Sequence, residues 1–192
     1  MLEDNIQIIV GLGNPGNEYA KTRHNAGFWF IDHLVSQHNL TLKNEAKFLG
    51  EIAKLSSPSG NIWLLKPTTF MNRSGQSIAR LAGFYKIKPE QILVVHDELD
   101  LPPGKVKLKQ GGGHGGHNGL RDSINQLGSK NFYRLRLGIG HPGNKEQVVG
   151  FVLGKTPQSE KLLIESAIDK SFDSIDLILQ GNMQKAMNQL HS

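Results

Sequence analysis

Short, apolar and β-branched segments alternate along this chain with segments of helical periodicity. Residues 6–10 are β-branched and run into a glycine, so they predict a buried strand. Apolar residues then recur at helical spacing and predict a helix over residues 26–38. The same two patterns predict strands over residues 48–55, 61–65, 91–95, 105–110 and 133–139, and helices over residues 77–85, 120–127 and 183–190. This alternation favours an α/β fold in which a twisted, mixed β-sheet carries helices on both faces.

One further helix is predicted near the end of the chain. Thr156 and Pro157 have the residue types of a helix cap and a first helical position. The helix that they open is expected to place these apolar residues on one face, against the core: Ile164, Ile168, Phe172, Ile175 and Leu179. Because there is no internal repeat and no low-complexity linker, residues 1–192 are interpreted as a single domain.

The composition excludes several classes of protein. Hydrophobic residues make up 38% and charged residues 20% of the 192 residues, which is typical of a folded domain and not of a disordered chain. No segment approaches the roughly 18 apolar residues of a membrane-spanning helix. The absence of cysteine excludes disulfides, thiolate catalysis and cysteine-ligated zinc, and it is consistent with a cytoplasmic location.

Positive charge is concentrated in the middle of the chain. The formal net charge is +5, yet residues 101–145 hold eight Lys and Arg against a single Asp, so the remainder of the chain is slightly acidic. Such a segment indicates a polyanionic partner, and the alternative is an ordinary solvated surface.

The basic residues of this segment lie on two predicted strands. Lys105, Lys107 and Lys109 alternate along one strand and therefore share a face. Arg134 and Arg136 alternate with apolar residues along another strand, so both arginines are expected to face water. Together these side chains would form a basic face.

A glycine motif directly follows the first predicted strand. Residues 11–16 read Gly-Leu-Gly-Asn-Pro-Gly and match the dinucleotide-binding pattern G-x-G-x-x-G. The surroundings do not support a nucleotide site: Pro15 removes an amide N–H that would bind phosphate, and no helix opens at once. The acidic residue at a suitable distance, Asp32, lies inside a predicted helix. We therefore favour a tight turn.

Two polar side chains follow separate predicted strands. His24 comes shortly after the loop that ends the first strand, and Asp97 follows the buried strand over residues 91–95. Because the carboxyl ends of strands in an open α/β sheet gather at one edge, these two side chains can meet there. A histidine oriented by a carboxylate is the general-base arrangement of hydrolytic sites. The alternative for Asp97 is a turn or helix-cap residue.

The most glycine-rich segment of the chain is nine residues long and contains six glycines and two histidines. So many glycines cost conformational entropy, which argues against a plain loop. In one interpretation His114 and His117 bind a metal ion, with His96 or Asp97 as a third ligand, although no recognised zinc motif is present. In the other, which we favour, the glycines bring backbone close to a substrate and direct Asn118 into a site.

Asparagines also lie near the ends of predicted strands. Asn14, Asn72 and Asn118 share this position, and side-chain amides can orient water or donate to an oxyanion without titrating. Phe70 and Met71 precede Asn72; the alternative is that both are core residues and that Asn72 is a helix N-cap. The chain has no cysteine nucleophile, no G-x-S-x-G elbow and no Walker A lysine, so a histidine-activated water is the simplest route to hydrolysis.

In their order along the chain, these motifs resemble those of the bacterial-type peptidyl-tRNA hydrolase family. The matching segments are residues 11–16, Tyr19, and residues 22–27, 66–72, 96–100, 111–122, 138–143 and 149–153. Several long motifs in order are far more specific than a lone glycine pattern. The resemblance implies a monomeric enzyme of translation and ribosome rescue that cleaves the ester between a peptide and the terminal ribose of tRNA, with no metal or other cofactor and no membrane association.

The resemblance also implies roles for the matching residues. The catalytic base would be His24, with Asp97 as its partner. The peptidyl ester and the water would be oriented by Asn14, Asn72 and Asn118, in a cleft lined by Tyr19, Phe70 and Met71. Phosphates of the tRNA would be faced by Lys107, Lys109 and Arg136. Two other classes stay open at this point: a non-enzymatic RNA-binding protein, and a metal- or nucleotide-dependent enzyme.

Overall fold

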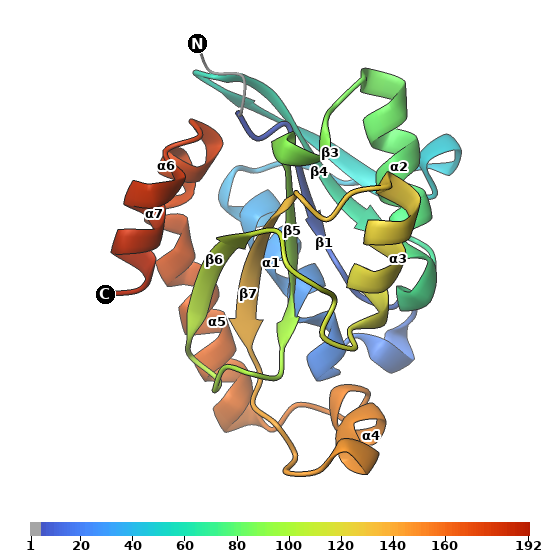
Figure 1. Ribbon diagram of the computed structural model, residues 1–192, viewed down its shortest axis with the longest axis vertical. Helices are drawn as coiled ribbons and strands as arrows, with labels where there is room; N and C mark the ends of the chain where they lie inside the picture. Colours follow the sequence, from blue (N-terminus) through green and yellow to red (C-terminus); the bar gives the residue numbers. More distant parts are fainter. Residues whose placement is uncertain (1–4) are drawn as a thin grey trace.

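The computed structural model describes residues 5–192 and shows one mixed sheet with helices packed around it (Figure 1). In this part of the chain the sheet has seven strands in the order β2-β3-β4-β1-β5-β7-β6. The strands are β1 (Ile8–Gly11), β2 (Lys43–Glu45), β3 (Gly50–Ser57), β4 (Gly60–Pro67), β5 (Ile92–Glu98), β6 (Val106–Gln110) and β7 (Tyr133–Gly138). Strands β4, β1, β5 and β7 run parallel, and the other three pair antiparallel with their neighbours.

Each face of the sheet has its own hydrophobic core. One face is covered by α1 (Ala26–Gln37), α5 (Gln158–Phe172), α6 (Ile175–Leu179) and α7 (Met183–Leu190), and the other by α2 (Ser74–Tyr85) and α3 (Asn118–Leu127). Successive residues of β5 enter the two cores in turn, Leu93 and Val95 on the α1 side and Val94 on the α2 side. The predicted fold class is therefore confirmed. Residues 1–4 of the predicted domain lie outside the described residues.

The structure departs from the predicted elements mainly where an element is short. The predicted C-terminal helix is two helices, α5 and α6, because Asp173 and Ser174 close the last turn with hydrogen bonds to carbonyls three residues back instead of four. Ser174 Oγ then donates to Gln189 in α7 at 2.8 Å, which holds the break against the next helix. Two short elements, β2 and α4 (Val148–Val152), were not predicted. Within residues 5–192 no helix has both the length and the apolar character needed to cross a membrane.

The topology brings several loops to one edge of the sheet. Strands β1, β5 and β7 are parallel, so the segments that follow them leave the sheet on the same side. Figure 1 shows α4 beyond the carboxyl ends of β5 and β7, and the segment between β6 and α3 crossing in front of the sheet. This edge is where we expected the polar residues to meet.

Candidate active site

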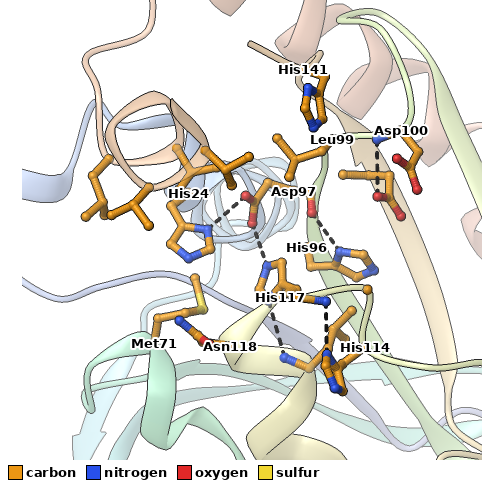
Figure 2. Close-up of a pocket in the computed structure, with 18 of the residues that line it drawn as sticks. His24, Met71, His96, Asp97, Leu99, Asp100, His114, His117, Asn118 and His141 are labelled. Carbon is orange, nitrogen blue, oxygen red and sulfur yellow. Dashed lines mark hydrogen bonds and ion pairs between the residues drawn. The ribbon is translucent and has the colours of Figure 1, made fainter. Parts of the chain in front are cut away.

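A cavity of about 770 Å³ opens at the carboxyl edge of the sheet (Figure 2). Every residue that the sequence assigned to the site contributes to its lining except Lys107: these are Asn14, Tyr19, His24, Phe70, Met71, Asn72, Asp97, Lys109, Asn118 and Arg136. They come from six segments that are distant in the sequence, and the parallel strands β1, β4, β5 and β7 bring the segments together.

His24 and Asp97 form a hydrogen-bonded pair in the lining of the cavity. A single 3-10 turn (Arg23–Asn25) before α1 presents His24, and the buried end of β5 presents Asp97. His24 Nδ1 lies 2.8 Å from Asp97 Oδ2, and both side chains are almost fully buried. Because Nδ1–H is held by the carboxylate, the second ring nitrogen of His24 is left to act as a base.

The glycine motif after β1 supports this turn by close packing. A Cβ atom on Gly11 would lie 2.1 Å from the carbonyl oxygen of Gly27, and one on Gly27 would lie 2.5 Å from the backbone N of Leu12. The start of α1 therefore packs directly on the first strand. Asn25 locks the contact, because its side chain accepts from the N–H of Asn14 at 2.8 Å and donates to the carbonyl of Asn14 at 2.9 Å.

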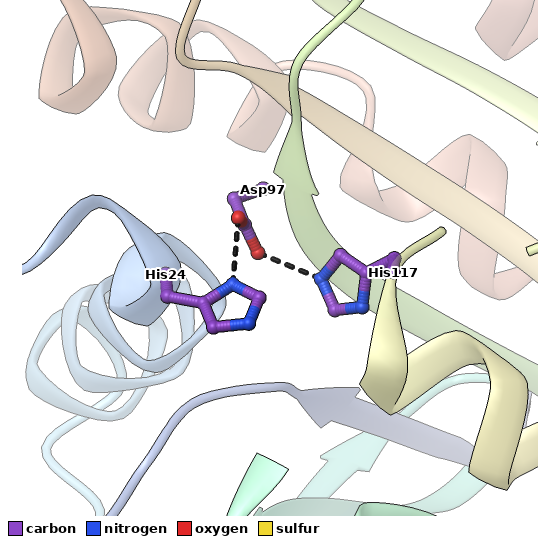
Figure 3. Close-up of side chains that lie close together, drawn as sticks. All are labelled: His24, Asp97 and His117. Carbon is purple, nitrogen blue, oxygen red and sulfur yellow. Dashed lines mark hydrogen bonds and ion pairs between the residues drawn. The ribbon is translucent and has the colours of Figure 1, made fainter. Parts of the chain in front are cut away.

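A second histidine, His117, contacts the same carboxylate from the other side (Figure 3). Its Nε2 lies 2.8 Å from Asp97 Oδ1, while its Nδ1 accepts hydrogen bonds from the backbone N–H groups of Gly119 and Leu120 at 3.1 and 3.3 Å. An imidazole that accepts through Nδ1 presents an N–H at Nε2, so His117 donates to Asp97. Sequence reasoning gave His117 no such role, because histidine is not among the usual N-cap residues.

The electrostatics of the three groups follow from this arrangement. Burial lowers the pKa of His24, but the charge of Asp97 and the hydrogen bond to it more than offset this, so the pKa lies above its ordinary value. Burial raises the pKa of Asp97, yet the two imidazoles hold it well below the usual range of a carboxyl. The neighbouring His96 is fully buried, and burial together with His117 lowers its pKa to about 3, so it stays neutral.

Amide groups surround the pair. Asn14 Oδ1 accepts from the backbone N–H of Met71 at 2.7 Å, which leaves the NH2 group of Asn14 for a ligand in the cavity. Asn72 and Asn118 are exposed on the cavity lining. Asn72 is not the N-cap considered above, since Arg73 occupies that position of α2.

One wall of the cavity is apolar. Phe70 is 57% exposed and makes an edge contact with Tyr19 at 6.2 Å between ring centroids, while Met71 is buried in the second core and still reaches the cavity. Val149 and Leu153, from α4 and the residue after it, add to this wall and are both exposed.

The comparisons with known proteins agree with this geometry. Residues 8–192 match the family described as peptidyl-tRNA hydrolase. The chain is 57% identical over 192 residues to the peptidyl-tRNA hydrolase of Vibrio vulnificus strain YJ016, covering 100% of this chain and 98% of that one. It is 56% identical over 191 residues to that of Neisseria meningitidis serogroup A, covering 100% of both chains.

This chain belongs to the peptidyl-tRNA hydrolase family. A crystal structure of a peptidyl-tRNA hydrolase in complex with N-propanol superposes with a TM-score of 0.94 at 52% identity, covering 99% of this chain and 96% of that one. The enzyme from Acinetobacter baumannii superposes with a TM-score of 0.93 at 53% identity and the same coverages. The predicted family, fold class and enzyme class are confirmed.

The basic end of the cavity differs in one respect from the prediction. Lys107 and Lys109 pair across β6 and β7 with Arg136 and Arg134, so all four leave the same face of the sheet. The expectation that Arg134 faces water was wrong, because this residue is 1% exposed. Its guanidinium donates to the carbonyls of Gly113 and, at 2.6 Å, of Gly112, so the glycine segment covers it. Arg136 is partly exposed and donates to Glu98 at 2.8 Å.

The glycine segment therefore reaches the sheet as well as the cavity. Gly111, Gly112, Gly115 and Gly116 all have positive φ angles, between 57° and 99°, which residues with a side chain rarely adopt. Only glycine lets the segment fold back over Arg134 and still deliver His117 and Asn118 to the site.

Proposed function

We propose that the enzyme hydrolyses the ester between a peptide and the 3′-terminal ribose of tRNA with a water molecule activated by His24. The observation that carries this proposal is the buried His24–Asp97 pair, 2.8 Å between nitrogen and oxygen, inside a cavity that also exposes amide donors. All of these groups come from one chain, which supports a monomer as the active unit. The cytoplasmic location indicated by the sequence stays a prediction.

Side chains of the cavity can carry out both proton transfers of the reaction. The free ring nitrogen of His24 accepts a proton from water while the water oxygen attacks the ester carbonyl. Amide donors of Asn14 and Asn118 stabilise the negative charge that develops on the carbonyl oxygen. The imidazolium then gives its proton to the departing ribose oxygen, so free tRNA and a peptide carboxylic acid result and His24 is neutral again. The peptide acid loses its remaining proton to solvent and leaves as a carboxylate.

Asp97 and His117 support this cycle without taking part in bond breaking. Asp97 keeps the proton of His24 on Nδ1 and stabilises the imidazolium that forms during the reaction. His117 donates to the second oxygen of Asp97 and thereby fixes the plane of the carboxylate. Because the backbone N–H groups of α3 occupy its Nδ1, His117 does not compete with His24 for the proton.

The two ends of the cavity suit the two parts of the substrate. The apolar wall with Tyr19, Phe70 and Met71 suits the peptide. Lys109 and Arg136 line the other end, and Lys107 continues the same basic face outside the cavity, which suits tRNA phosphates.

We also propose that the reaction is independent of metal. The side chains of His24, Asp97 and His117 offer ligand atoms within 4.8 Å of one another, so a metal site has to be considered. A metal ion would need the lone pair of His117 Nε2, yet this nitrogen carries a proton while Nδ1 caps α3. His114 is not part of this group; its Nδ1 accepts from the backbone N–H of Gly116 at 2.9 Å.

Metal independence is tested by chelation. Turnover is expected to survive prolonged EDTA treatment and removal of the chelator without added metal. Stoichiometric zinc in the active protein, combined with loss of turnover when the zinc is removed, would contradict the proposal.

Catalysis is tested by incubating peptidyl-tRNA with the wild-type enzyme and with His24→Ala. We expect His24→Ala to lower kcat by about 10²–10⁴-fold, with a much smaller change in tRNA affinity, because a general base acts mainly in the transition state. His33→Ala is the matched control, since His33 lies on the surface of α1 beside Asp169, outside the cavity lining. Near-normal turnover by His24→Ala would refute the mechanism.

A further inference from the structure

Arg23 directly precedes His24, yet its side chain contacts a different part of the molecule. The side chain is 11% exposed, and its two hydrogen bonds reach α4 and α5, which are more than 100 residues away in the sequence. The mechanism above does not use this buried cation. Its Nε atom has no hydrogen-bond partner in residues 5–192, so the terminal Nη atoms make both contacts.

The first contact is with the end of α4. Arg23 Nη1 donates to the carbonyl oxygen of Phe151 at 3.0 Å, and the guanidinium carbon lies 3.9 Å above the centre of the Phe151 ring. Phe151 is one of the last residues of α4, where helix carbonyls lack partners within the helix and a cation is favourable. Arg23 therefore caps this short helix and stacks on it at the same time.

The second contact is with the first turn of α5. Arg23 Nη2 lies 3.0 Å from Glu160 Oε2. Backbone hydrogen bonds join the same two regions, from Arg23 N to the carbonyl of Gly154 at 3.4 Å and from Thr156 N to the carbonyl of Lys21 at 2.9 Å. The turn that carries His24 and the segment that follows α4 are thus joined as one unit.

The position of α4 matters because it forms part of the cavity wall. Val148, Val149 and Val152 of this helix line the cavity together with Leu153, and Val149 is 68% exposed. Outside its own loop, α4 packs mainly on the turn over residues 23–25. Figure 1 shows the helix standing beyond the end of the sheet, and its inner side packs on the core of the α1 face through Val152.

We propose that Arg23 is a positioning residue that fixes the position of the apolar α4 wall relative to His24. The wall then holds the side chain of the substrate's esterified amino acid while His24 acts on the ester. The proposal rests on the assignment of His24 as the base. A wall coupled to the base in this way favours esters of large apolar residues over those of glycine, because only a large side chain reaches the wall.

A purely structural role of Arg23 predicts something different. If the arginine only stabilises the fold through its ion pair with Glu160, its loss lowers thermal stability and affects all substrates equally. The two contacts can be separated, because Glu160→Gln removes the ion pair with α5 and leaves the contact with Phe151 in place.

The experiment compares wild type, Arg23→Lys, Glu160→Gln and His24→Ala on N-acetyl-leucyl-tRNA and N-acetyl-glycyl-tRNA, with kcat, KM and the thermal midpoint measured for each. Lysine keeps the charge but cannot stack on Phe151 and bond two acceptors in one plane. We expect Arg23→Lys to lower kcat/KM for the leucyl ester about tenfold or more, with a much smaller loss for the glycyl ester. Glu160→Gln is expected to keep the wild-type ratio between the two esters.

Every other outcome contradicts either the positioning role of Arg23 or the assignment of His24 on which it rests. Equal losses for both esters, or an Arg23→Lys enzyme that behaves like Glu160→Gln, would overturn the positioning role. If Arg23→Lys does not fold, Phe151→Leu removes only the stacked ring and should lower the leucyl-to-glycyl ratio in the same direction; an unchanged ratio there also overturns the role. Activity in His24→Ala would instead refute the catalytic assignment on which the proposal rests.

Discussion

Two imidazoles contact Asp97, and they differ in whether their second ring nitrogen can accept a proton. The Nδ1–H of His24 and the Nε2–H of His117 point at its two oxygens, each at 2.8 Å. The remaining nitrogen of His117 is occupied by the start of α3, whereas the remaining nitrogen of His24 lies in the cavity wall. The hydrogen bonds of the second nitrogen, and not the carboxylate, decide which histidine can act as the base.

The pH dependence of the enzyme tests this assignment. His24 must be neutral to accept a proton, so kcat/KM is expected to fall as the pH drops through its pKa, which lies above the ordinary value of 6.5. Asp97→Asn removes the charge that raises this pKa and keeps the burial that lowers it, so the acidic limb should move to lower pH. Maximal turnover should also fall, though less than in His24→Ala.

The measurement is a pH profile of kcat/KM for wild type and Asp97→Asn at constant ionic strength. Asp32→Asn is a suitable control, because this carboxylate pairs with Lys66 on the surface of α1. An acidic limb at the same pH in wild type and Asp97→Asn would show that another group controls it.

At the scale of elements, the glycine segment and β7 depend on each other through Arg134. Alternation along the strand predicts a solvent-facing arginine, but the segment between β6 and α3 folds over this face and accepts both hydrogen bonds of the guanidinium. The segment in turn ends in His117 and Asn118, so the buried arginine supports one side of the site.

Replacing this arginine should loosen the segment. In Arg134→Lys a single nitrogen replaces the two guanidinium nitrogens that bond the glycine carbonyls and cannot reproduce both bonds in the same geometry. We therefore expect a loss of about 1–3 kcal/mol in the free energy of unfolding. Amide hydrogen exchange should become faster at residues 112–117 than elsewhere. The exposed Arg121→Lys on α3 serves as a control, and unchanged exchange in the glycine segment would contradict the role of Arg134.

Short elements also explain where prediction of the fold fell short. Long elements such as α1 and β5 bury one face or both, so their apolar residues follow a clear period. The five residues of α4 are too few to show a period, and this helix is held by a distant arginine. The break between α5 and α6 was missed because apolar spacing continues across it while two polar residues end the first helix.

At the scale of the whole molecule, the two faces of the sheet differ in character at its β6 edge. Val106, Leu108, Leu135 and Leu137 are buried in the core on one face. On the opposite face Lys107, Lys109 and Arg136 extend from the cavity outward. One edge thus contributes to the core on one face and presents basic side chains on the other.

The basic face makes a prediction about salt dependence. Lys107→Ala and Arg136→Ala should each weaken binding of different tRNAs by similar factors, because phosphate contacts carry no sequence information. The slope of log affinity against log salt should become shallower by about one unit or somewhat less per contact removed. Turnover at saturating substrate should change little, and small peptidyl esters without the tRNA body should be cleaved as by wild type.

Lys43→Ala is the matched control, since Lys43 is an exposed strand lysine at the opposite edge of the same sheet. If Lys107→Ala and Arg136→Ala keep the wild-type affinity and slope, the basic face is only a solvated surface and the RNA docks elsewhere.

Local patterns in the sequence were enough to establish the α/β class, most strands and helices, the basic segment and the residue types of the site. These properties depend on residues that are neighbours along the chain, and neighbours determine periodicity and turns. Most partners of buried polar groups were decided by the tertiary structure alone. His117 meets Asp97 across 20 residues, and Arg23 meets Glu160 across 137. A buried charge or imidazole must find its hydrogen-bond partner wherever the fold brings one within reach, and no local pattern encodes which distant segment that is.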